Sequence, residues 1–458
     1  MSIRPALHIR SLAPLLVGSL VGGLLVAPAA TAPAGALERP PAQRAPQVLR
    51  HSFTYDGTVV RLDLRPVGIR SPGFQAFSQG ADGTLTPRRV APARAYLGGV
   101  VGQPGAVAVA IRRTDGVLAG QVTVDRGATV RFAGREVVET RGLTPPAAFA
   151  WPSAEDATRN VTVAPGQVGT ATRRWDLGVD LDASYATGDL RRSIGPAMDA
   201  VDLLTVQLLA TYERDARLRP ALKRVVLRLD DAASPYAGVE GGDLGKVREE
   251  WTPALDADVV DDVALLHDEG GGGVAYVGTA GSDYAVSVNG PGADIDVVRH
   301  ELGHQWGPGD NHTNGPEGAT IESGNQYARF DGTELSSIFR RRDTRLADQP
   351  RRFPVVPTLR TDLPPYAALD LRDRLRSGVA VTLRPARNDH DANGTRVRLA
   401  SVAGRSHLGG RVSRSGEVVT YVPPRVGAVR TVDWFTYRVV DPTGRPATGV
   451  VVVRVSPG

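Results

Sequence analysis

The stretch His300-Glu301-Leu302-Gly303-His304 decides how this chain is interpreted. Residues four apart lie on one face of a helix, so His300 and His304 can direct their imidazoles at the same metal ion. Glu301 lies beside them, where a carboxylate can act on a metal-bound water without being a ligand. The flanking sequence predicts a helix from Ile295 to Trp306, because apolar residues recur every four positions and Gly307 follows its end.

This segment resembles the metzincin zinc peptidases, whose motif is HExxHxxGxxH, and especially their bacterial reprolysin-like, or adamalysin-like, branch. The resemblance implies a zinc ion held by His300, His304 and a third ligand, with Glu301 as the catalytic base. We favour His312 as the third ligand, because the residues that follow it resemble the family's sequence after its third histidine. Asp310 is the alternative, in the register of a minor variant with an aspartate ligand. Otherwise Asp310 is a turn residue or a carboxylate that supports a ligand.

One position departs from the family pattern. Metzincins carry a methionine in a tight turn beneath the metal, and residues 320–325 resemble that turn with Glu322 in the methionine position. A carboxylate there can hydrogen-bond a histidine ring or rotate outward, and the sequence leaves both arrangements open. The departure concerns the finer geometry of the site and leaves the expected ligands unchanged.

Residues 173–350 form the predicted zinc metallopeptidase domain. Strand-like alternation at 175–181, a helical pattern from 196 to 212 and an apolar strand at 222–229 precede the histidine motif. This order resembles a metzincin catalytic domain, which implies an α/β fold with a mixed twisted sheet and a zinc helix. The run 273–278 resembles the strand beside the family's cleft, which implies backbone groups that bind an extended substrate.

The N-terminal region predicts export followed by an all-β domain. In residues 1–36, basic residues precede an apolar stretch and small residues, so we expect a signal peptide and a secreted, extracellular protein. The absence of cysteine excludes a lipoprotein anchor and disulfides. Residues 37–143 resemble a reprolysin-type propeptide or prodomain, and 144–172 form a predicted linker. Arg173-Arg174 is a candidate cleavage point.

The C-terminal region returns to strand-like alternation after a second predicted linker at 351–365. Residues 366–458 resemble bacterial cadherin-like or Ig-like repeats, which are β-sandwiches. Asp389, Asp391 and Asn393 have the alternate spacing of a Ca²⁺ loop, but no acidic residue follows at the bidentate position. Calcium binding by this domain is therefore a hypothesis beside a solvated polar turn.

Charge and hydropathy limit the classes of partner. The net charge is +5 and the pI is about 9.6, but no basic run is interleaved with aromatic residues, which disfavours nucleic-acid binding. The apolar stretch within residues 1–36 is too short and too glycine-rich for a membrane span, and no later segment approaches about twenty apolar residues, so we expect no membrane span. The charge is compatible with association with an anionic cell wall or surface. We expect a monomer that acts on a protein or peptide substrate.

Together these features predict a secreted zinc-dependent endopeptidase in which Glu301 activates a water bound to zinc. The alternative is a non-enzymatic secreted surface or adhesion protein with a degenerate metzincin domain, which the altered turn at Glu322 supports. The intact Glu301 argues against this alternative, because a structural zinc ion needs no base. A metallohydrolase that acts on something other than peptides also fits the motif.

Overall fold

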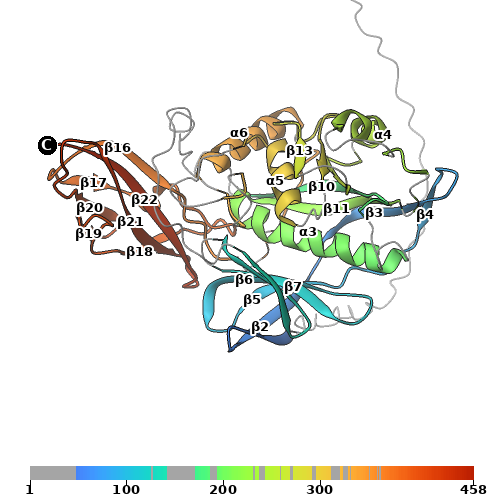
Figure 1. The fold of residues 1–458 in the computed structure, drawn as a ribbon, viewed down its shortest axis with the longest axis horizontal. Helices are drawn as coiled ribbons and strands as arrows, with labels where there is room; N and C mark the ends of the chain where they lie inside the picture. The colour runs from blue at the N-terminus through green and yellow to red at the C-terminus, as the bar shows by residue number, and fades with distance from the viewer. Residues whose placement is uncertain are drawn as a thin grey trace, which may run out of the picture. The chain divides into compact units, whose positions relative to one another are not determined.

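The computed structural model describes residues 48–124, 127–141, 171–185, 193–228, 230, 233–236, 243–257, 259–268, 272–290, 295–310, 320–322, 328–330, 332–349, 351–357, 359 and 363–458. Strands predominate in these residues and helices are few (Figure 1). The predicted signal peptide lies outside the described residues. The linker predicted at 144–172 also lies outside them, apart from its last two residues.

An antiparallel sheet forms most of the N-terminal region. Its strands follow the order β1-β2-β5-β6-β7-β8-β9. Their bounds are Leu49–Tyr55, Thr58–Val67, Ala95–Val100, Gln103–Arg112, Leu118–Thr123, Thr129–Ala133 and Glu136–Arg141. Side chains alternate between the two faces of a strand, and one face here forms a core that includes Phe53, Leu64 and Phe132.

A second, mixed sheet carries the region around the histidine motif. Its strands follow the order β13-β14-β12-β10-β11-β3-β4, and β15 pairs with β10. The bounds are β3 Arg70–Gln79, β4 Leu85–Arg88, β10 Thr172–Leu181, β11 Leu218–Leu227, β12 Asp262–Leu266, β13 Gly273–Ala275, β14 Val286–Asn289 and β15 Val355–Val356. The central strands β10, β11, β12 and β14 are parallel, which explains their long apolar runs, since parallel strands are covered on both faces.

Strand β3 belongs to the N-terminal region by sequence but to the central sheet by pairing. It runs parallel to β11, with Phe77 opposite Val226, and β4 then pairs with it in the antiparallel direction. Alternation in a sequence predicts a strand without identifying its partner. The linear division into 37–143 and 173–350 therefore does not anticipate a sheet shared by both regions.

The candidate cleavage point lies inside strand β10. The backbone N–H of Arg173 donates to Arg217 O at 3.0 Å, and that of Arg174 donates to Pro354 O at 3.0 Å. Arg173 also lies in register with residues of both β11 and β15. A protease would have to open the central strand before cutting here, so the folded chain does not favour cleavage at this point.

One long helix lies between the two sheets (Figure 1). The described helices are α3 (Ile194–Ala216), α4 (Leu244–Asp256), α5 (Ile295–Gln305) and α6 (Gly332–Asp348). One face of α3, including Leu208 and Tyr212, packs into the main core with β10 and β11. Its other face places Val206 and Leu209 against Val109 of the N-terminal sheet. Helix α3 is therefore buried on both sides.

The C-terminal region folds into two sheets, as the sequence predicts. One has the order β16-β22-β21-β18 and the other β17-β20-β19. Their bounds are β16 Asp370–Arg376, β17 Val381–Leu383, β18 Arg398–Val402, β19 Arg411–Ser415, β20 Val418–Val422, β21 Thr431–Val440 and β22 Pro446–Ser456. Tyr421, Phe435 and Val453 form part of a separate core for this region.

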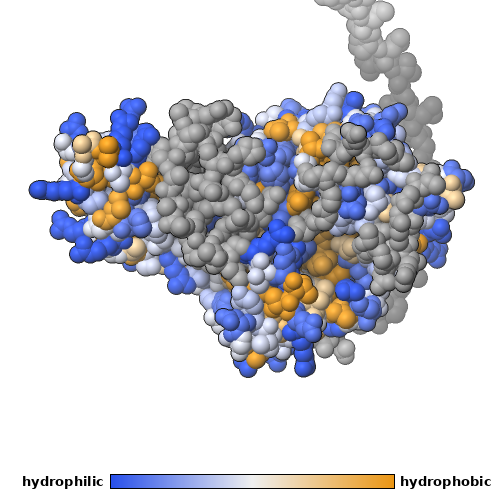
Figure 2. Space-filling view, in the orientation of Figure 1, coloured by the Kyte–Doolittle hydropathy of each residue, from blue (hydrophilic) through white to orange (hydrophobic). Residues whose placement is uncertain are grey.

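The visible surface is mixed in character. Hydrophilic and hydrophobic residues are interspersed among the coloured atoms of Figure 2, without a single continuous field of either kind. Within the described part of the chain, no helix has the length and apolar content needed to cross a bilayer.

Candidate metal centre

Helix α5 carries the histidine motif, and its sequence explains its position. Val298, Leu302 and Trp306 are fully buried in the main core and fix one side of the helix. His300 and His304 lie on a neighbouring face with their ring centroids 4.4 Å apart. The helix predicted from residue 295 to residue 306 is confirmed to within one residue.

Asp310 completes a group of three ligand side chains. Its Oδ1 atom lies 3.1 Å from Nε2 of His300 and 3.5 Å from Nε2 of His304. The ligand atoms of the three residues lie within 4.8 Å of one another, and no other such group of three occurs among the described residues. Two imidazoles and a carboxylate are a donor set that catalytic zinc uses, with one position left open. The residues present therefore fit a zinc ion.

Backbone carbonyls orient both rings. Nδ1 of His300 lies 2.7 Å from Ile321 O, and Nδ1 of His304 lies 3.0 Å from Pro308 O. A carbonyl accepts only, so these contacts assign the ring proton to Nδ1. The lone pair of each Nε2 is then available on the side that faces Asp310.

Glu301 is held next to the three ligands but in a more apolar setting. It is 3% exposed, and its Oε1 atom lies 4.0 Å from Nε2 of His300. Burial, together with repulsion from the Asp310 carboxylate, raises the pKa of Glu301 to about 8. The backbone of β13 also approaches closely, since a Cβ atom on Gly273 would lie 2.6 Å from Glu301 Oε1.

Glu322 turns inward beneath the rings, which answers the question that the sequence left open. Its Oε2 atom lies 3.1 Å from Nδ1 of His304 and 3.6 Å from Nδ1 of His300, and its side chain has no exposed surface. A Cβ atom on Gly303 would lie only 2.0 Å from Glu322 Oε1. The carboxylate therefore occupies the space that a glycine leaves on helix α5.

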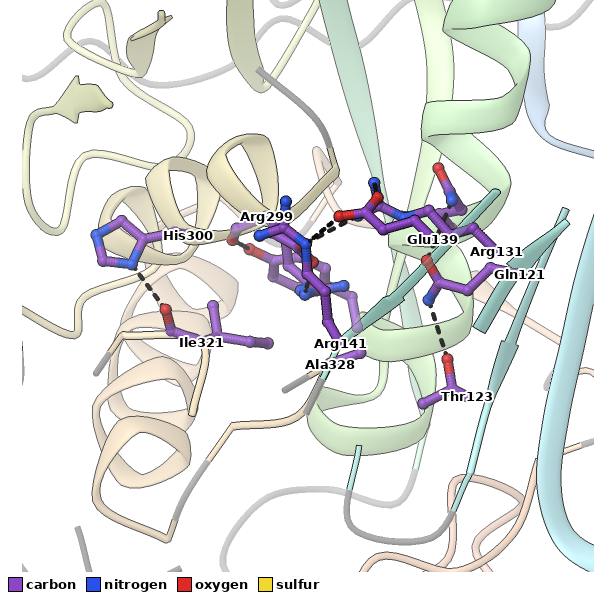
Figure 3. A network of polar contacts seen from close by, with 12 residues as sticks. Gln121, Thr123, Arg131, Glu139, Arg141, Arg299, His300, Ile321 and Ala328 are labelled. Carbon is purple, nitrogen blue, oxygen red and sulfur yellow. Dashed lines mark hydrogen bonds and ion pairs between the residues drawn. The ribbon is translucent and has the colours of Figure 1, made fainter. Parts of the chain in front are cut away.

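An ion network joins the start of helix α5 to the N-terminal sheet (Figure 3). Asp296 accepts from Arg131 at 2.8 Å and pairs with Arg141 at 3.2 Å, both on the N-terminal sheet. Arg299, fully buried on the same helix, donates to Asp296 at 2.5 Å. Glu139 binds both sheet arginines. Three cations therefore converge on one buried carboxylate.

The segment 328–330 links the metal centre to both flanking regions. Ile321, whose carbonyl contacts His300, donates its N–H to the carbonyl of Arg329 at 3.0 Å. Gly127 of the N-terminal region accepts from the N–H of the segment's first residue at 2.7 Å. Tyr366 of the C-terminal region donates to the carbonyl of its last residue at 2.7 Å. The sequence offered no signal for these contacts, since they depend on residues far apart in the chain.

His312, which we favoured as the third ligand, lies outside the described residues and stays a prediction. Of the turn predicted at 320–325, only 320–322 are described. The structure brings together the two helix histidines and Asp310, the alternative ligand.

The aspartate side chains of the suggested calcium loop accept hydrogen bonds from other groups of the protein. Asp389 Oδ1 accepts from the Ala368 N–H at 2.7 Å and from the Tyr437 hydroxyl at 3.0 Å. Asp391 Oδ1 accepts from the backbone and side chain of Asn393, each at 3.0 Å. Calcium binding there stays a prediction.

Comparison with known families identifies a bacterial Ig domain at residues 362–454. This match coincides with the region of two sheets and with the Ig-like part of the expected resemblance. No curated protein matches the chain.

Three solved structures are among those that share some similarity with this chain. Metalloproteinase-II from Bacteroides fragilis is similar at 7% identity and a TM-score of 0.35, over 64% of this chain and 91% of that one. A chaperone–substrate complex is similar at 15% identity and a TM-score of 0.30. The match covers 37% of this chain and 34%, about a third, of that one. An endo-fucoidan hydrolase of glycoside hydrolase family 107 is similar at 14% identity and a TM-score of 0.16, over 21% of this chain and 14% of that one. TM-scores of this size do not establish a shared fold, so the metzincin resemblance stays a prediction.

Proposed function

We propose that the chain is a secreted zinc-dependent endopeptidase with a metzincin-type catalytic domain. The observation that carries the proposal is the convergence of His300, His304 and Asp310 around a common point, with Glu301 next to it. A purely structural site has no use for a buried carboxylate beside the ligands. That argues against the alternative of a non-enzymatic surface or adhesion protein.

We assign the third ligand to Asp310 in this proposal. Its carboxylate faces both Nε2 atoms, and it is 48% exposed, so it can adjust to an incoming ion. His312 follows two residues later and competes for the same role.

The residues divide the chemistry between them. When bound, zinc polarises the scissile carbonyl and makes a water easier to deprotonate. Glu301 takes a proton from the attacking water and passes it to the leaving amine, since its carboxylate lies on the Nε2 side of His300, whereas that of Glu322 faces the Nδ1 atoms. The carbonyls of Ile321 and Pro308 keep the two rings from rotating.

Strand β13 supports a peptide as the substrate. It is the last strand of the central sheet and pairs only with β14 among the described strands. An extended peptide could add to its open edge through backbone hydrogen bonds. Because Gly273 contacts Glu301, a peptide on this edge would pass beside the proposed base.

The test uses the exported full-length chain and measures zinc per chain together with cleavage of unfolded casein. We expect about one zinc and chelator-sensitive cleavage. Glu301→Gln should keep the zinc and lose about 10²- to 10⁴-fold in turnover. The exposed His407 provides a control, His407→Ala, which should change neither. Full activity of Glu301→Gln would refute the proposal.

The third ligand is tested with the same measurements. Asp310→Ala should reduce zinc content, whereas His312→Ala should leave it unchanged. The reverse result would return the role to His312.

A further inference from the structure

We propose that Glu322 is a positioning residue of the metal centre, which holds both histidine rings from the side opposite the metal, and that Gly303 is needed to admit its carboxylate. This inference rests on the zinc site proposed above. It adds a residue that the resembled family does not use, since that family carries methionine at this position. A carboxylate brings a negative charge beneath the rings, which a thioether does not.

The carboxylate lies where it can act on both rings at once. Oε2 is within 3.1 Å of Nδ1 of His304 and 3.6 Å of Nδ1 of His300. Each Nδ1 donates its hydrogen bond to a backbone carbonyl, and neither carboxylate oxygen of Glu322 accepts a hydrogen bond from a ring. Glu322 therefore acts on the rings through its charge and its close packing beneath them, and rotation of either ring would move its N–H dipole away from both the carbonyl and the carboxylate.

The position of Glu322 is fixed by the backbone on either side. Ile321 is fully buried, and its N–H and carbonyl are both engaged, with Arg329 and His300. Thr320 donates to the buried carboxylate of Glu334. An outward rotation of Glu322 would also leave a void against helix α5.

Gly303 is the matching feature on the helix. A Cβ atom at this position would overlap Glu322 Oε1, at 2.0 Å, and would approach Phe330 to 3.2 Å. The glycine sits inside a helix, where alanine is ordinarily more stable. The close approach of the carboxylate gives a reason for glycine here.

Groups that orient ligand histidines commonly change metal affinity by about 10- to 100-fold when they are replaced. We expect a loss of this size in Glu322→Gln and Glu322→Met, measured by competition with a chromogenic chelator. The visible spectrum of the cobalt-loaded protein should also shift, because the ring geometry changes. The metal-free proteins should unfold at or above the wild-type temperature, since a buried carboxylate has been removed.

Two further variants separate positioning from general damage. Asp433→Asn removes a buried carboxylate on strand β21 of the C-terminal region and should leave zinc affinity unchanged. Gly303→Ala should weaken zinc about as much as Glu322→Gln. In a Glu322→Ala background, Gly303→Ala should add little further loss, because the two positions act through one contact.

Wild-type zinc affinity and an unchanged cobalt spectrum in both Glu322→Gln and Glu322→Met would overturn the inference. A wild-type chain that binds zinc but cleaves no peptide would refute the proposed endopeptidase, while the affinity measurements would still decide the role of Glu322. A wild-type chain that binds no zinc would overturn both.

Discussion

The N-terminal and C-terminal β regions flank the same central sheet, but they are joined to it by different interactions. The N-terminal region contributes strand β3 to that sheet and surrounds Asp296 of helix α5 with arginines. The C-terminal region has two sheets of its own and shares no described strand with the central sheet. It docks through groups such as Tyr366 and His390. A shared sheet makes two regions one cooperative unit, whereas docking leaves each able to fold separately.

The largest effect is expected from removing everything before residue 171. This deletion takes β3 from the edge of β11 and uncovers Val206 and Leu209 on α3. We expect the remaining chain to lose cooperative unfolding, measured by circular dichroism and calorimetry. Removal of residues 366–458 is the comparison and should lower stability while a single transition remains. A folded, zinc-binding chain starting at 171 would show that the N-terminal region is dispensable.

The next largest effect is expected from breaking the ion network around Asp296. Asp296→Ala should cost about 3–5 kcal/mol in the free energy of unfolding, because Arg131 and Arg299 would be left with less compensation in a buried site. Urea denaturation measures it. Asp63→Ala, which removes the exposed partner of Arg50, should cost less than about 1 kcal/mol. Equal effects of the two substitutions would contradict the importance of the network.

The N-terminal attachment should weaken as pH rises through the acidic range. Asp202 on α3 pairs with Arg70 of β3 at 2.9 Å. Burial raises the pKa of Asp202 to about 6, against the opposing effect of Arg70, and Asp199 adds repulsion. Its folded-state pKa exceeds the unfolded value near 4, so its contribution is full below about pH 4 and is lost as pH rises to about 6. Asp202→Asn should remove this dependence, which is at most about 1.4 kcal/mol per pH unit.

The attachment of the C-terminal region should instead weaken as pH falls. Burial and the nearby charges of Arg217 and Arg342 together lower the pKa of His390 to about 3, against the opposing effect of the Asp215 carbonyl. The unfolded value is near 6.5, so the contribution is full above pH 6.5 and is lost as pH falls towards 3, by about 1.4 kcal/mol per pH unit. Urea unfolding of His390→Gln at pH 7 and pH 5 checks this. An unchanged difference from wild type at the two pH values would contradict it.

The smallest effect concerns a single hydrogen bond of the C-terminal docking. Tyr366→Phe removes the hydroxyl that donates to Phe330 O. We expect a loss of about 1 kcal/mol, measured by thermal unfolding, with zinc affinity unchanged. A loss as large as that of Asp296→Ala would erase the distinction between the two attachments.

Local periodicity explains which parts of the fold the sequence predicts well. Helix α5 and strand β10 are recognisable because their apolar residues repeat at helical or strand spacing. The two-sheet C-terminal region follows in the same way. The parallel pairing of β3 with β11 has no local signature, because both are simply strands until their partners are known.

The same distinction applies to the candidate site, where residues close in sequence can be predicted and contacts between distant residues cannot. His300, Glu301 and His304 are adjacent in sequence, so their spacing alone brings them together. The inward direction of Glu322 depends on contacts with Gly303 and on the turn at Ile321, which spacing cannot reveal. The choice between Asp310 and His312 depends in the same way on the path of a loop.

The pairing of β3 with β11 also imposes a delay during synthesis of the chain. About 150 residues separate β3 from β11, the parallel strand with which it pairs. At a ribosomal rate of about 5–20 residues per second, β3 emerges roughly 7–30 seconds before β11 exists. During that interval its edge is open to other extended chains. Slower translation between residues 80 and 218 should therefore increase aggregation of the nascent chain.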